Sequence, residues 1–243
     1  MSALKSEFRK LTTLRSTYGL ILFALAIIGI FAFWVTGYRA DPMSLQNPGL
    51  LANNIVSAVQ SVAIFGALAT LLLVVNEYRH NTIMYTLTLA NSRAKVLLAK
   101  IITASVFGVV FTVAAATISP LFTVLGVALQ GGEMAAQTIP YSDILWRILF
   151  FGWAYTMLAV SIAVLLRNQI AAIATLLLFP TTAEPLLGLL LKENSSYLPF
   201  TALFNVILDG TAMSPAKAAA VVMVYVVVAW IASWFVFIKR DAN

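Results

Sequence analysis

The sequence predicts an all-α integral membrane protein with six transmembrane helices and an N-terminal amphipathic helix at the membrane interface. Of its 243 residues, 61% are hydrophobic and only 10% are charged, and the mean hydropathy is +0.95. Apolar runs of about 20 residues, the length that crosses a ~30 Å hydrocarbon core, recur along the chain. A helix is the expected form because it satisfies its own backbone hydrogen bonds inside lipid. We expect residues 1–243 to form a single transmembrane domain.

The N-terminal segment carries an apolar stripe. Leu4, Phe8 and Leu11 recur at four- and three-residue spacings, with three basic residues between them: Lys5, Arg9 and Lys10. This pattern predicts a short interfacial helix over residues 2–16, with its basic residues near lipid headgroups. The alternative is an ordinary positive flank that anchors the first span.

Six apolar runs follow. The predicted spans are residues 18–35, 55–75, 101–129, the stretch between Arg147 and Arg167, a run that begins after Gln169, and residues 218–238. At about 1.5 Å per residue the third run is longer than the bilayer needs, so it should tilt, kink near Pro120 or project beyond the lipid.

Polar and aromatic residues mark the ends of these runs. Trp34 and Tyr38 close the first span at interface depth. Ser142 or Asp143 is expected to cap the fourth helix, and Ser214 with Pro215 to open the sixth.

The fifth run is irregular. Residues 179–185 read FPTTAEP, and two prolines around Glu184 predict a helix break that must be packed in protein or face water. Glu184 is either an intramembrane charge on a transport path or a solvated carboxylate at the outer mouth, and the second is our expectation. Residues 197–208 are too short to span; they form either short helices in the outer leaflet or an external loop.

The distribution of positive charge predicts the orientation. With a cytoplasmic N-terminus, eleven of the 15 Lys and Arg residues fall on the inner face. The outer face then holds only Arg39, Arg147, Lys192 and Lys217. This bias places both termini and residues 76–100 on the cytoplasmic side of a plasma or inner membrane.

Catalytic and metal-binding motifs are missing from the sequence. There is no cysteine, the only histidine is His80, and no glycine is followed directly by lysine, so the phosphate-binding GxxxxGK[ST] loop is absent. We expect no enzyme activity, no metal site and no cofactor in this chain. The net charge of +6 is explained by membrane orientation, so we expect no nucleic-acid partner.

Residues 76–100, NEYRHNTIMYTLTLANSRAKVLLAK, form a polar segment between two membrane-length runs. Glu77 stands at the C-terminal end of a predicted helix, where the macrodipole disfavours an anion by about 0.3–1 kcal/mol. We expect compensation from Arg79 or from a basic residue at the start of the third span. Ile83 and Leu87 give a following short helix one apolar face, which either docks in a groove of a partner or rests on the membrane and neighbouring helices. Ser92 is expected to cap the third helix.

Glu77-Tyr78-Arg79-His80-Asn81-Thr82, followed by Ser92-Arg93 and Lys100, resembles the cytoplasmic signature of the type-2 permease family of ATP-binding-cassette (ABC) exporters. That signature is an E-x-x-x-G-T-like segment followed by S-R and a lysine in the next helix. The segment from Glu7 to Leu11, EFRKL, is also similar to the family. Two positions depart from the pattern: Asn81 replaces the usual glycine, and Ala90-Asn91 stands where a proline is common. Asparagine tolerates a left-handed backbone, so the turn can survive.

The resemblance implies the permease subunit of an ATP-driven exporter, working as a homodimer or heterodimer with separate ATPase subunits that bind ATP and Mg²⁺. The segment between the second and third spans would be the coupling helix. The aromatic and methionine residues of the spans suit an apolar or amphipathic substrate. With the apolar face included, the expected ATPase-coupling residues are Glu77, Arg79, Thr82, Ile83, Leu87, Arg93 and Lys100. The alternative function is an ion-coupled carrier or channel that uses Glu184.

Overall fold

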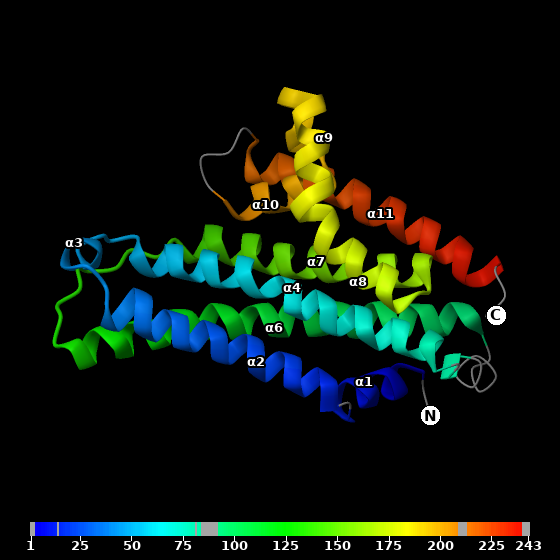
Figure 1. Cartoon of the computed structure of the whole chain (residues 1–243), viewed down its shortest axis with the longest axis horizontal. Coiled ribbons are helices and arrows are strands. Elements are labelled where there is room, and N and C mark those ends of the chain that lie inside the picture. Colours follow the sequence, from blue (N-terminus) through cyan, green and yellow to red (C-terminus); the bar gives the residue numbers. More distant parts are fainter. Residues whose placement is uncertain (1–2, 14, 81, 84–91, 209–212, 240–243) are drawn as a thin grey trace.

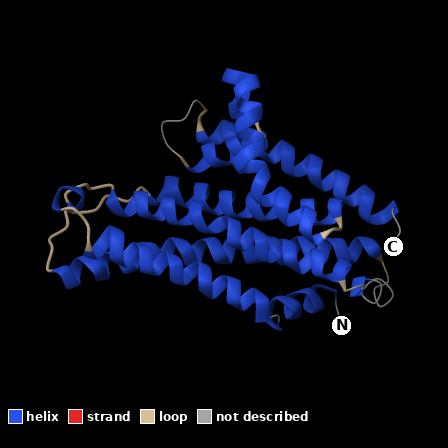
Figure 2. Ribbon diagram, in the orientation of Figure 1, coloured by secondary structure: helices blue, strands red, loops and turns tan. Residues whose placement is uncertain are grey.

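The computed structural model describes residues 3–13, 15–80, 82–83, 92–208 and 213–239. These residues are almost entirely helical and form no strand (Figure 2). The elements are α1 (Ala3–Thr13), α2 (Arg15–Phe31), η1 (Ala32–Tyr38), α3 (Pro42–Leu45), α4 (Leu50–Arg79), α6 (Arg93–Gln130), α7 (Tyr141–Leu166), α8 (Gln169–Leu178), η2 (Phe179–Ala183), α9 (Glu184–Leu191), η3 (Lys192–Tyr197), α10 (Pro199–Ile207) and α11 (Pro215–Lys239).

Six helical stretches are long and apolar enough to cross a membrane, which confirms the predicted fold class. They are Tyr18–Tyr38, Leu50–Arg79, Arg93–Gln130, Tyr141–Leu166, Gln169–Tyr197 and Pro215–Lys239. The third spans 38 residues. At about 1.5 Å per residue it is roughly 57 Å long, so it exceeds the hydrocarbon core as its sequence predicts.

The core of the bundle is formed by α4, α6 and α7, which pack on one another (Figure 1). Phe151, Tyr155 and Met157 of α7 are among the most buried large side chains. Helix α2 lies along α4 and α6, and α11 lies along α7 and α10. Most of the outward side chains of α2 and α11 are apolar, as membrane helices require.

Different elements lie at the two ends of the bundle. Helix α1, the C-terminal ends of α4 and α11 and the N-terminal end of α6 gather at one end, and η1, α3 and residues 131–140 lie at the other (Figure 1). Helices α1 and α11, which hold the two ends of the described chain, therefore both reach the end of the bundle where α4 ends and α6 begins.

The predicted break in the fifth span is confirmed in part: the regular α-helix is interrupted at residues 179–183, but the backbone remains helical. Helix α8 continues through the wide π-helical turn η2 into α9. The Thr181 hydroxyl donates to the Leu177 carbonyl at 2.8 Å, and the Thr182 hydroxyl donates to the Leu178 carbonyl. The wide turn accommodates the proline ring, and the hydroxyls bind carbonyls of the preceding turn, so the helix continues.

The predicted helix starts are partly confirmed. Pro215 opens α11, and Ser92 is the residue before α6, although its side chain makes no capping hydrogen bond. Helix α7 begins at Tyr141 after Pro140, so Ser142 and Asp143 lie inside its first turn and the predicted cap is wrong. The fixed φ of proline suits a helix start, which explains the earlier boundary. Helix α10, within the predicted segment 197–208, packs on α7 and α11.

Candidate functional site

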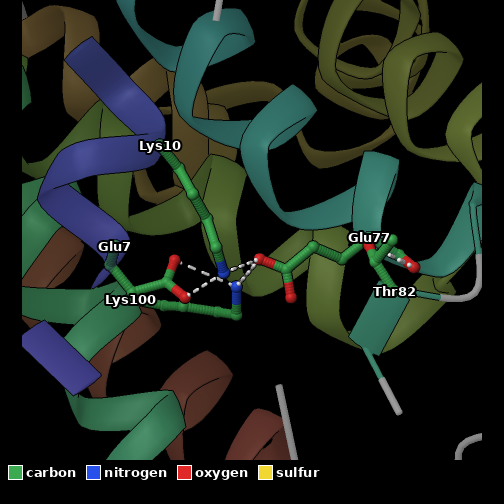
Figure 3. Close-up of polar contacts among 5 residues, drawn as sticks. All are labelled: Glu7, Lys10, Glu77, Thr82 and Lys100. Carbon is green, nitrogen blue, oxygen red and sulfur yellow. Dashed lines mark hydrogen bonds and ion pairs between the residues drawn. The ribbon is translucent and has the colours of Figure 1, made fainter. Parts of the chain in front are cut away.

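Four charged side chains from three helices form one ion-pair network, here called the tetrad: Glu7 and Lys10 of α1, Glu77 of α4 and Lys100 of α6 (Figure 3). The Lys10 Nζ lies 2.6 Å from Glu7 Oε1 and 2.7 Å from Glu77 Oε1. The Lys100 Nζ lies 3.1 Å from Glu7 Oε2 and 2.5 Å from Glu77 Oε1. Each lysine therefore bridges the same two carboxylates.

The tetrad is enclosed and electrically neutral. Lys100 is 3% exposed, Glu7 5% and Glu77 6%, while Lys10 stands at the rim. Two carboxylates and two ammonium groups cancel, which is the arrangement that makes burying charge tolerable. Among the described residues, Glu77 Oε2 is buried without a hydrogen-bond partner. The two positive and two negative charges cancel with none to spare, so removing one member leaves a buried charge without its counterpart.

The rim residue Lys10 keeps its charge. Burial lowers its pKa, but the neighbouring carboxylates of Glu77 and Glu7 outweigh burial and raise the pKa above its ordinary value of 10.5. Helix α1 is therefore held to the ends of α4 and α6 by a charged lysine at every physiological pH.

The tetrad answers the question raised by Glu77. Of the two expected partners, a basic residue at the start of the third span is correct: it is Lys100. Arg79 instead donates from Nη1 to Gln169 Oε1 of α8 at 2.9 Å. The partnership with Lys10 was missed: sequence reasoning expected this side chain near lipid headgroups, and the structure turns it toward Glu7 and Glu77. The opposite charges of Glu7 and Lys10, three residues apart, were visible in the sequence, but their distant partner was not.

The other expected coupling residues have separate partners. The Thr82 hydroxyl lies 3.5 Å from the Glu77 carbonyl oxygen. Arg93 donates to the Ile238 carbonyl of α11 at 3.1 Å. Ile83 is 1% exposed and belongs to the core of this chain, which agrees with the alternative that its face rests on neighbouring helices. Leu87 lies outside the described residues.

Glu184 is 2% exposed, so its expected solvation at an outer mouth is wrong. Its carboxylate accepts hydrogen bonds from Phe200 N and Thr201 N, both at 2.7 Å, and from the Thr201 hydroxyl at 2.8 Å. These donors belong to the first turn of α10, where backbone N–H groups lack helical partners and the dipole favours an anion. Glu184, the first residue of α9, thus caps the N-terminal end of α10.

Arg147 of α7 caps the opposite end of α10. Its Nε donates to the Val206 carbonyl at 2.8 Å and its Nη2 to the Ile207 carbonyl at 3.2 Å, while Nη1 pairs with Asp143. Sequence reasoning placed Arg147 among the outer-face charges and missed this role, because its partners are backbone atoms about 60 positions away. The short helix α10 is thereby held by charges that match both ends of its dipole.

The model of a family described as ABC-2 family transporter protein matches residues 3–183. The match covers more than half of the chain and includes all four tetrad residues. A search of curated proteins found no match.

Proposed function

The chain belongs to the ABC-2 transporter family, and on that premise we propose that it is the membrane-spanning permease subunit of an ATP-driven exporter. A separate ATPase subunit binds ATP and Mg²⁺, and its conformational change drives export of an apolar or amphipathic substrate through this chain. The complex contains two permease chains, identical or related. It resides in the plasma or inner membrane with both termini in the cytoplasm.

The single observation that carries the proposal is the tetrad at the base of the α4–α6 connection. Glu77 is close to the C-terminal end of α4, and Lys100 lies two turns into α6. Glu7 and Lys10 add α1 to the same junction. A displacement applied to the segment between α4 and α6 is therefore passed to three helices together, because ion pairs at 2.5–3.1 Å join them.

The remaining contacts of this end extend the junction. Arg79 reaches α8 through Gln169, and Arg93 reaches α11 through the Ile238 carbonyl. Expected coupling residues thus connect to the fifth and sixth spans. This supports a role in which movement at one end of the bundle changes the packing of several spans at once.

Co-expression with a candidate ATPase tests the proposal. The two subunits should co-purify, and K100M should reduce ATP hydrolysis per assembled complex at least about fivefold, the lower range of ordinary coupling energies. K95M is the matched control, because Lys95 is exposed on the same helix. E77Q is paired in the same way with E133Q, since Glu133 is exposed in the loop between α6 and α7.

Failure of the subunits to co-purify, or K100M and E77Q complexes as active as their controls, would refute the proposal. Transport that persists without ATP and collapses with the proton or sodium gradient would instead favour the ion-coupled carrier that uses Glu184.

A further inference from the structure

A strip of uncharged polar residues runs along the N-terminal third of α4. Asn54, Ser57, Gln60 and Ser61 share one face of the helix, at spacings of three, four and seven residues. Ser57 and Ser61 are exposed, and Asn54 and Gln60 are partly exposed. Within the described part of the chain, neither the Ser57 hydroxyl nor the Gln60 side-chain amide has a hydrogen-bond partner. The Ser61 hydroxyl donates to the Ser57 carbonyl at 2.8 Å, and the Asn54 side-chain amide donates to the Thr123 hydroxyl at 3.1 Å. Because polar groups on a membrane helix do not face lipid without cost, the Ser57 hydroxyl, the Gln60 amide and the acceptor capacity of the Ser61 hydroxyl are available to a ligand.

Two hollows flank the polar strip. The first, of about 220 Å³, lies between α2 and α4, with Ile27, Phe31 and Phe65 as its large apolar side chains. The second, of about 430 Å³, lies on the other flank of α4 and includes Gln60 and Tyr155 in its wall. Ser57 and Ser61 line both hollows, so the strip is their common wall. The larger hollow is within the size range of small-molecule sites, about 300–1,000 Å³.

The walls of the two hollows offer no charged side chain to a charged ligand. None of the described residues that line either hollow is Lys, Arg, Asp or Glu. Glu184 follows shortly after Pro180 and Thr181 of the second hollow. Its carboxylate already accepts hydrogen bonds from the first turn of α10. A charged headgroup placed here would lose its hydration without gaining a counter-ion, whereas hydroxyl and amide groups would find donors and acceptors of their own kind.

We propose that the polar strip and its two hollows bind an uncharged amphiphile. Its hydroxyl- or amide-bearing headgroup bonds to Ser57, Gln60 and Ser61, and its apolar part packs against Ile27 and Phe31. That this amphiphile is the exported cargo rests on the proposed function. That it binds at the polar strip does not depend on the proposed function.

Photolabelling of the full chain in nanodiscs tests the proposal. The probes are a diazirine-tagged dodecyl maltoside and dodecyl sulfate and dodecyl trimethylammonium analogues that carry the same tag on the same chain. The neutral probe should label peptides of α2 and α4 saturably and at least about tenfold more than either charged probe, because the site offers no counter-ion. Excess unlabelled dodecyl maltoside should abolish this labelling.

Variants connect the labelling to the polar strip. S57L/S61L should reduce labelling by the neutral probe about tenfold, because leucine fills both hollows and removes the hydroxyls. S57T/S61T, which keeps the hydroxyls, should retain the preference for the neutral probe. T117L is the matched control: Thr117 is an exposed hydroxyl residue on α6 outside both hollows.

Equal labelling by charged and neutral probes, or unchanged labelling of S57L/S61L, would overturn the inference. The experiment needs neither ATP nor an ATPase. A chain that shows neutral-selective labelling but assembles with no ATPase would contradict only the proposed function, and a complex that K100M uncouples but that labels without selectivity would contradict only this inference.

Discussion

Replacing Lys100 with methionine tests whether the tetrad stabilises the junction of α1, α4 and α6. Methionine has similar length without charge, so the change leaves Glu7 and Glu77 to share Lys10 alone. Removing one partner of a buried ion pair costs about 3–5 kcal/mol. Because Lys10 stands at the rim, where water reaches the remaining charges, we take the lower end, about 3 kcal/mol.

Thermal unfolding in detergent, followed by tryptophan fluorescence, measures this loss. For a chain of this size 1 kcal/mol corresponds to a Tm shift of roughly 2–4 °C, so K100M should lower Tm by about 6–12 °C. K95M, at an exposed position of the same helix, should stay within about 2 °C, as surface substitutions do.

A double mutant separates charge balance from packing. E77Q/K100M removes one anion and one cation and leaves the neutral pair of Glu7 and Lys10. The stability lost in the double mutant should therefore be at least about 1 kcal/mol smaller than the sum of the losses in E77Q and K100M. If K100M has the same Tm as K95M, or if the stability losses of E77Q and K100M add in the double mutant, charge balance does not stabilise this junction.

Three further outcomes are expected. E184Q should lower Tm by several degrees, because an amide N–H faces the donors at the start of α10 and about 1.5–3 kcal/mol of charge-assisted bonding is lost; E193Q, at an exposed site, should not. G126A should be destabilised by about 1–3 kcal/mol, because a Cβ there would overlap backbone atoms of η1, whereas G19A meets open space and should be neutral or slightly stabilised; equal effects would refute the close approach. The pKa of Lys10 is raised on folding above 10.5, so its stabilisation is complete below that value and is lost as pH rises through the folded pKa; wild type should lose stability faster than K10M only above about pH 10.5, and parallel curves would contradict the shift.

The number and position of the membrane helices followed from sequence because lipid imposes a local rule. A run such as residues 55–75 must satisfy its backbone within itself, so its length and apolar character are sufficient to predict a helix. The start of α11 at Pro215 was predictable for another local reason, because proline is favoured at the first position of a helix. The continuation through η2 was not, because it depends on how two threonine hydroxyls bond to the preceding turn.

Sequence therefore determined that this chain is a six-span membrane protein, that Glu77 needs a counter-charge and that a polar segment connects its second and third helices. Only the tertiary structure decided that Lys10 and Lys100 supply that charge, and that Glu184 and Arg147 cap the ends of α10. The physical reason is that these contacts join positions 16 to 93 residues apart. The spacing of charges along a chain shows which groups need partners, but the packing of the helices decides which partners they meet.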